Sequence, residues 1–210
     1  MGIRSTNVDK IKSAVMQNSM FIGLIVIGIM TRIVLSLVMP AGYDLFFVIA
    51  AFSIAGGYAL QSRYALLIPI TIMLVSDMVL YTFFSAHYPY SSSLLLMVSI
   101  LMLTGFMLMS QISIRARKLT SRPAFTPLLM GTTWGVLGYD IWTNFGWWLG
   151  PYYPNTMHGL VMCFTMAAPF MLWHMLSTLA AVPVIYTVLH WMESKHDLPA
   201  LETEPSPAGN

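Results

Sequence analysis

The chain alternates between long apolar runs and short polar connections. No Asp, Glu, Lys or Arg occurs between Asp140 and Glu193, and a second charge-free run lies between Asp77 and Arg115. One bilayer crossing needs about 20 apolar residues, so each run can hold more than one crossing or a crossing and a loop. This pattern predicts about six transmembrane helices, at residues 19–38, 45–60, 64–84, 94–110, 127–148 and 160–190.

The composition supports a protein that lives in a membrane. Of the residues, 57% are hydrophobic and only 9% are charged, whereas a soluble domain carries about 25% charged residues. We expect an all-α integral membrane bundle, and Pro169 is predicted to kink its last helix. The predicted parts are a cytoplasmic N-terminal segment at 1–18, a six-helix transmembrane domain at 19–192, and a disordered cytoplasmic tail at 193–210.

The basic residues follow the predicted connections in a regular way. The N-terminus, the second and fourth connections and the tail contain Lys or Arg, whereas the other connections contain none. Positive residues stay on the cytoplasmic side of a membrane, so both termini are predicted to lie in the cytoplasm, with the helices in the plasma membrane. The net charge of +2 comes from these scattered residues. It forms no patch that would indicate a nucleic-acid partner.

Three ionisable residues fall inside predicted helices: Arg32, Asp77 and Asp140. Each lies about 20 Å from the inner membrane boundary, in the outer half of the bilayer. A charge at such depth costs at least about 2.5 kcal/mol and usually marks a functional site or an ion pair. One interpretation is a polar cluster beneath the outer face. The other is a structural Arg–Asp pair that holds helices together, with the second Asp protonated or reaching the interface.

The outer end of the fifth predicted helix carries polar and aromatic residues. Asp140, Asn144 and Trp147 share one face, and Thr143 is adjacent. Polar groups beside rigid rings suit a small planar ligand with heteroatoms. An interfacial aromatic belt is the alternative, and it does not explain Asp140, Thr143 and Asn144. That belt would account for the aromatic residues Trp147, Trp148, Tyr152 and Tyr153.

Other reactive side chains give weaker indications. His158 lies in the outer loop and is a further candidate for ligand contact, whereas His174, with Ser177 and Thr178 one turn on, is predicted to pack through hydrogen bonds. No His and carboxylate have convincing metal spacing, so we expect no metal. No phosphate-binding Gly-x-x-x-x-Gly-Lys loop is present, so the chain is not predicted to hydrolyse ATP or to hold a cofactor.

A stripe of small residues runs along the second predicted helix at Ala51, Ala55 and Ala59, with Gly56 and Gly57 beside it. Small residues at this spacing allow another helix to approach closely. The stripe indicates either packing inside the bundle or a docking face for another membrane subunit.

Several short motifs occur in an order that resembles a known pattern. They are Arg32, Ser76-Asp77, Thr143-Asn144-Phe145 with Trp148, Tyr153-Pro154, Gly159-Leu160 and Pro169-Phe170. Over roughly residues 30 to 190, the chain resembles a family of small, largely uncharacterised membrane proteins. That family is in turn similar to the substrate-binding (S) subunits of energy-coupling-factor vitamin transporters.

The resemblance implies a six-helix bundle that captures a small, planar nutrient at its outer face. A membrane coupling subunit and two ATPase subunits would be supplied by other chains. In this resemblance, Arg32, Asp77 and Asp140 would form a polar floor for the ligand. Thr143 and Asn144 would form a hydrogen-bonding wall. Trp147, Trp148 and Tyr153 would form a stacking surface. The alternatives are a membrane enzyme or assembly factor that uses the same outer cavity, and a structural subunit of a larger complex. Because no nucleophile–base pair is visible, we do not expect an enzyme.

Overall fold

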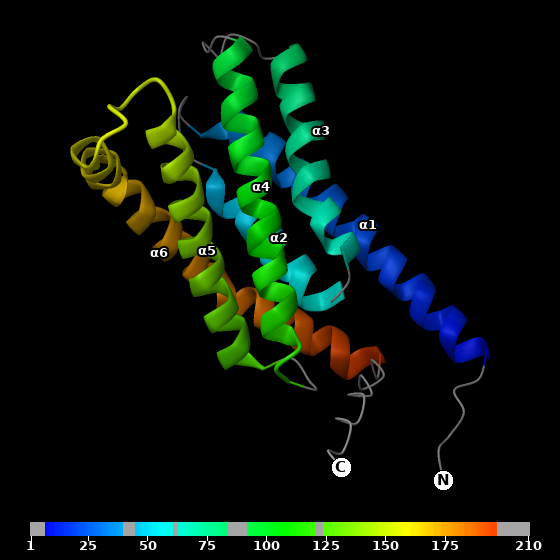
Figure 1. Cartoon of the computed structure of the whole chain (residues 1–210). Coiled ribbons are helices and arrows are strands. Elements are labelled where there is room, and N and C mark those ends of the chain that lie inside the picture. Colours follow the sequence, from blue (N-terminus) through cyan, green and yellow to red (C-terminus); the bar gives the residue numbers. More distant parts are fainter. Residues whose placement is uncertain (1–6, 40–44, 61–62, 84–91, 121–123, 197–210) are drawn as a thin grey trace, which may run out of the picture.

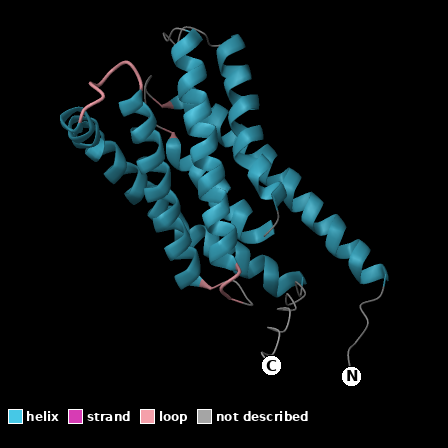
Figure 2. Cartoon of the chain, in the orientation of Figure 1, coloured by secondary structure: helices cyan, strands magenta, loops and turns pink. Residues whose placement is uncertain are grey.

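The computed structural model describes residues 7–39, 45–60, 63–83, 92–120 and 124–196. In these residues all regular structure is helical, as Figure 2 shows. The elements are α1 (Asn7–Val38), α2 (Phe46–Leu60), the short 3-10 helix η1 (Arg63–Leu66), α3 (Leu67–Phe83), α4 (Ser92–Arg117), α5 (Phe125–Leu149) and α6 (Met157–His196) (Figure 1).

All six predicted helices are present, but several are longer than their apolar runs. α1 begins inside the predicted segment 1–18, and α4 continues beyond residue 110 to Arg117. A helix extends past the hydrocarbon region where polar residues with good helix propensity, such as Gln and Arg, follow the apolar ones. α6 continues through Pro169 and Pro183 as one helix. α6 ends at His196, so residues 193–196 of the predicted disordered tail are helical, and residues 197–210 lie outside the described residues.

Four of the helices are long and apolar enough to cross a membrane, which indicates a membrane protein. These segments are Gln17–Val38, Tyr64–Phe83, Leu96–Arg117 and Met157–Met192. α2 is apolar but shorter, with 15 residues. α5 has 25 residues, but these include four glycines, four threonines, Asp140 and Asn144. Large apolar side chains such as Ile22, Val26 and Met30 are exposed along the outside of the bundle, where they would face lipid.

α2 lies at the centre of the bundle. It contacts α1, α3, α4, α5 and α6, which are more neighbours than any other described helix has. Its large side chains Phe46, Ile49, Ile54 and Tyr58 are buried. The remaining main contacts join α4 to α5, α5 to α6, and α1 to α3. A short helix can occupy this position because its neighbours, rather than lipid, surround it.

Small residues let α2 and α4 approach closely. A Cβ atom added at Gly57 would lie 2.6 Å from the carbonyl oxygen of Ser110. The hydroxyl of Ser113 donates a hydrogen bond of 2.8 Å to the carbonyl of Ile54, and that of Ser110 donates one of 3.3 Å to the carbonyl of Ser53. Glycine at position 57 therefore permits a helix contact that a larger residue would prevent.

The alanine stripe lies on the least buried side of α2, whose fully buried residues include Ile49, Ile54 and Tyr58. Ala51, Ala55 and Ala59 are each half-buried and pack against the hydrophobic core. This partial burial is compatible with packing inside the bundle and with docking of another membrane subunit, so both interpretations of the stripe stay predictions.

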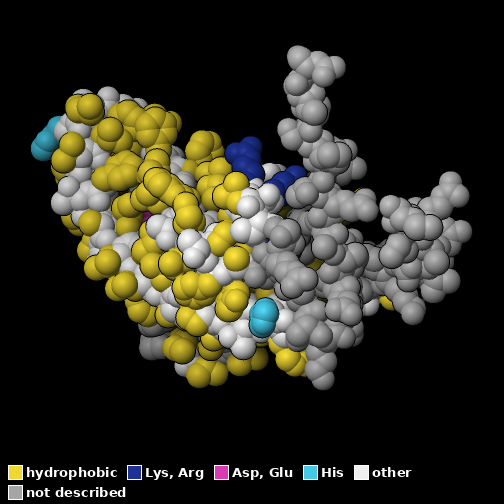
Figure 3. Space-filling view, turned by 90° about the horizontal axis from the view of Figure 1, so that it is seen from below, with side chains coloured by type: hydrophobic (Ala, Val, Ile, Leu, Met, Phe, Trp, Pro, Cys, Tyr) yellow, Lys and Arg dark blue, Asp and Glu magenta, His cyan; other side chains and the backbone are white. Residues whose placement is uncertain are grey.

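The two ends of the bundle differ in their side chains. At one end α5 finishes and α6 begins (upper left in Figure 1), and Trp147, Trp148, Tyr152 and Tyr153 gather in this region. We call it the aromatic end. The opposite end, where α4 finishes, carries Arg115, Arg117 and Lys118, and we call it the basic end. Figure 3 views the molecule from this side and shows Lys and Arg side chains close together.

Candidate functional site

Arg32 on α1 and Asp77 on α3 form an ion pair. The Nη1 atom of Arg32 lies 2.6 Å from Oδ1 of Asp77. The same nitrogen donates to the hydroxyl oxygen of Ser76 and, at 3.3 Å, to the carbonyl of Met73. α1 and α3 pack side by side, so the two charges neutralise each other between these helices. This is the Arg–Asp pair that the sequence suggested as a structural element.

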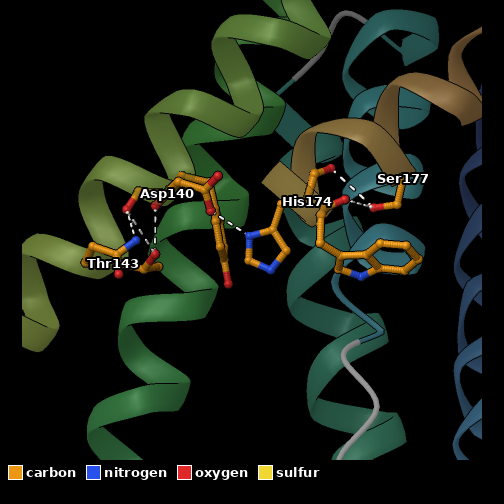
Figure 4. Close-up of polar contacts among 7 residues, drawn as sticks. Asp140, Thr143, His174 and Ser177 are labelled. Atoms are coloured by element: carbon orange, nitrogen blue, oxygen red, sulfur yellow. Dashed lines mark hydrogen bonds and ion pairs between the residues drawn. The ribbon is translucent and has the colours of Figure 1, made fainter. Parts of the chain in front are cut away.

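Asp140 has a different partner. Its Oδ1 atom lies 2.6 Å from Nδ1 of His174 on α6 (Figure 4). Asp140 is almost fully buried, with 1% of its surface exposed. The three residues predicted to form one cluster are therefore divided between two pairs, Arg32–Asp77 and Asp140–His174. His174, predicted to be a packing residue, is also the partner of a buried carboxylate.

Aromatic rings from two other elements hold the imidazole of His174. The ring of Phe46 on α2 stacks on it with centroids 3.9 Å apart and an interplanar angle of 24°. The ring of Tyr139 on α5 approaches edge-on at 6.0 Å. Phe106 on α4 in turn stacks on Phe46 at 5.4 Å. The orientation of His174 is thus fixed by packing as well as by its contact with Asp140.

Thr143 and Asn144 lie one turn from Asp140 toward the aromatic end. The hydroxyl of Thr143 donates a hydrogen bond of 2.9 Å to the carbonyl of Tyr139. The amide nitrogen of Asn144 donates one of 2.8 Å to the backbone carbonyl of Asp140. A carbonyl oxygen only accepts hydrogen bonds, so the amide nitrogen must be the atom that faces it. The side-chain oxygen of Asn144 then points elsewhere and accepts no hydrogen bond from the residues that the structure describes.

Trp148 fixes the connection between α5 and α6. Its indole Nε1 donates to the carbonyl oxygens of Pro154 and Thr156, at 3.1 and 3.2 Å. The hydroxyl oxygen of Thr156 accepts a hydrogen bond of 3.2 Å from the backbone of Gly159, and so caps the start of α6. A Cβ atom added at Gly159 would meet the carbonyl oxygen of Pro154. The predicted stacking residue Trp148 therefore also positions this loop.

The other predicted contacts at the aromatic end are more open. Trp147 is half-buried and packs against Tyr152, with ring centroids 5.3 Å apart. In the described part of the chain its indole nitrogen makes no hydrogen bond. Tyr153 is half-buried in the loop, and His158 is exposed in the first turn of α6. Both lie at the same end as Trp147, several residues beyond Asp140 along the chain.

The structure offers no metal centre among the residues it describes, since no group of three or more His, Cys, Asp or Glu there is arranged to hold an ion. Cys163 is buried and its thiol lies 3.3 Å from the backbone carbonyl of Asn144. This contact joins α6 to α5 beside the Asp140–His174 pair.

Comparison with known proteins identifies a family but not an activity. No curated protein and no solved structure matches the chain. One family model matches residues 12–201, which is nearly the whole sequence, and its description is a family of unknown function. The expectation of an uncharacterised family is confirmed. The chain therefore belongs to this family of unknown function, DUF6580.

Proposed function

We propose that this chain is the substrate-capturing membrane subunit of an uptake transporter for a small, vitamin-like nutrient. The observation that carries the proposal is a pair of open hydrogen-bonding groups on one side of α5. The side-chain oxygen of Asn144 and the indole nitrogen of Trp147 make no hydrogen bond with the residues that the structure describes. They lie three residues apart on α5, one and two turns from Asp140 of the buried Asp140–His174 pair.

These groups suit a particular kind of ligand. Asn144 offers an acceptor and Trp147 offers a donor, while the paired rings of Trp147 and Tyr152 offer aromatic surface. A planar molecule that has both a donor and an acceptor on its edge would use all of them. Tyr153 and His158 lie at the same end and are further candidates for contact. The proposal assigns no covalent chemistry to the chain.

The charge distribution supports capture from outside the cell. Arg115, Arg117 and Lys118 lie at the end opposite Trp147 and Tyr152, and positive residues favour the cytoplasmic side. We therefore orient the aromatic end outward, with α2 and α5 completing six crossings and both termini in the cytoplasm of a plasma-membrane protein. In analogy to the S subunits that the sequence resembles, a membrane coupling subunit and ATPase subunits would be separate chains.

A structural subunit is the second candidate. The observation in its favour is that the Arg32 and Asp77 charges neutralise each other between α1 and α3. An ion pair of this kind needs no ligand to account for it. The two candidates differ in one respect: only the first requires a small molecule at the aromatic end.

Untargeted mass spectrometry of small molecules released from the detergent-purified protein tests the proposal. We expect one compound to accompany the natural protein and to decrease at least tenfold with Asn144→Ala or Trp147→Ala, because each removes a contact worth roughly 1–3 kcal/mol. Trp134→Ala is the matched control, since Trp134 is 59% exposed on the same helix. Equal amounts of every compound in all four monodisperse preparations, or no compound in any of them, would contradict the proposed function.

A further inference from the structure

Thr178 on α6 differs from the other buried hydroxyl residues of the described chain. Its side chain has no exposed surface, and its hydroxyl makes no hydrogen bond. Every other buried Ser or Thr donates its hydroxyl hydrogen to a backbone carbonyl: Ser53, Ser76, Ser110, Ser113, Thr132 and Thr143. Thr178 is the exception to a rule that the rest of the bundle obeys.

The usual local solution is not adopted at this position. A helical threonine commonly donates to the carbonyl four residues earlier, which for Thr178 belongs to His174. That carbonyl accepts a hydrogen bond of 3.3 Å from Ser177 instead (Figure 4). Thr178 therefore keeps both a donor and an acceptor inside the protein, where an unmet polar group is costly.

The position of Thr178 places it beside polar side chains. Residues four apart in a helix share a face, so Thr178 lies one turn from His174 on the side that faces α5 and α2. His174 contacts Asp140 at 2.6 Å. A carboxylate has about four lone-pair sites, so Asp140 can accept a further hydrogen bond in addition to those it already has. A buried water molecule makes two to four hydrogen bonds, and the Thr178 hydroxyl together with the Asp140–His174 pair would supply that number of partners.

We propose that Thr178, His174 and Asp140 form an internal hydration site that holds one water molecule between α5 and α6. The water accepts from or donates to the Thr178 hydroxyl and donates to the Asp140–His174 pair. Thr178 lies one turn from His174 toward the basic end, whereas Asn144 lies one turn from Asp140 toward the aromatic end. The inference therefore does not depend on the proposed function, because the water is bound whether or not a nutrient is captured.

Thermal unfolding in detergent gives the first test. Thr178→Val keeps the shape of the side chain and removes the hydroxyl, so loss of the water should lower Tm by about 2–4 °C. Thr178→Ser keeps a hydroxyl, so it should keep the hydrogen-bonded link to Asp140 through the water. In an Asp140→Asn background the effect of Thr178→Val should shrink. The effect of the control Thr132→Val on Tm should be the same in both backgrounds, because the Thr132 hydroxyl donates to a carbonyl of its own helix. An increase of Tm with Thr178→Val would overturn the proposal, because it would show that the hydroxyl has no partner.

Nuclear magnetic resonance provides a direct second measurement on the full chain. With threonine methyl groups labelled, a long-lived water should give a cross-peak between the Thr178 methyl and water. The methyl of Thr132, which is equally buried, serves as the internal comparison. No cross-peak at Thr178 in the folded protein would overturn the hydration site, even if the Tm changes followed the expected pattern.

Discussion

The carboxylate of Asp140 on α5 contacts the imidazole Nδ1 of His174 on α6 at 2.6 Å, and Phe46 from α2 stacks on that imidazole. Three helices thus meet at one polar contact inside an apolar bundle. Arg32 and Asp77 make the corresponding contact between α1 and α3. The carboxylates of Asp77 and Asp140 therefore each have a basic partner on a neighbouring helix.

The Asp140–His174 pair should contribute to stability in a way that depends on both members. His174→Ala leaves the buried carboxylate without this partner and should lower Tm strongly, since removing one member of a buried pair commonly costs several kcal/mol. Asp140→Asn introduces a neutral amide and should lower Tm less. The double variant should recover part of the loss, and thermal unfolding of all three in one detergent measures this. Strictly additive losses would show that the two side chains act independently.

Ligand binding and stability should respond separately to Asp140→Asn. If the pair belongs to the capture site, the variant should bind the co-purifying compound at least tenfold more weakly than the natural protein, while remaining monodisperse. Trp191→Ala, exposed near the end of α6, should leave binding unchanged. Normal binding by Asp140→Asn together with a lower Tm would assign this pair to structure alone.

Gly57 and Gly23 offer a matched test of the close contact between α2 and α4. Gly57→Ala places a Cβ atom 2.6 Å from the carbonyl oxygen of Ser110, so the helices must separate and Tm should fall. Gly23→Ala meets no atom within 4 Å and should leave Tm unchanged or raise it, because alanine favours a helix by about 1 kcal/mol over glycine. Equal effects of the two substitutions on thermal unfolding would contradict the observed packing.

The orientation in the membrane can be checked with topology reporters. Because the basic residues lie at one end of the bundle, reporters fused after Asn210 or inserted within residues 115–122 should read as cytoplasmic. Reporters within 85–93 or 151–158 should read as external. An external signal from 115–122 would contradict both the six-crossing arrangement and the direction of the proposed uptake.

The apolar runs predicted the helices well, because the length needed to cross a bilayer is visible in the sequence. The same reasoning placed Arg32, Asp77 and Asp140 at a similar depth but could not choose their partners. The depth of a residue in the membrane follows from its position along a helix, but it does not tell which neighbouring helix the side chain faces. α1 packs on α3, whereas α5 packs on α4 and α6, so Asp140 meets His174, 34 residues later in the chain. The sequence signal for this partner was His174, a histidine within the longest charge-free run.

The central position of α2 has a consequence for how the protein is made. α2 precedes α4, α5 and α6 in the chain, yet it packs against all three. During synthesis it leaves the ribosome before these neighbours exist, and its 15 residues are short for a bilayer crossing. The final placement of α2 must therefore follow the arrival of α4 through α6, so assembly of the bundle ends with the enclosure of a helix that was among the first to be synthesised.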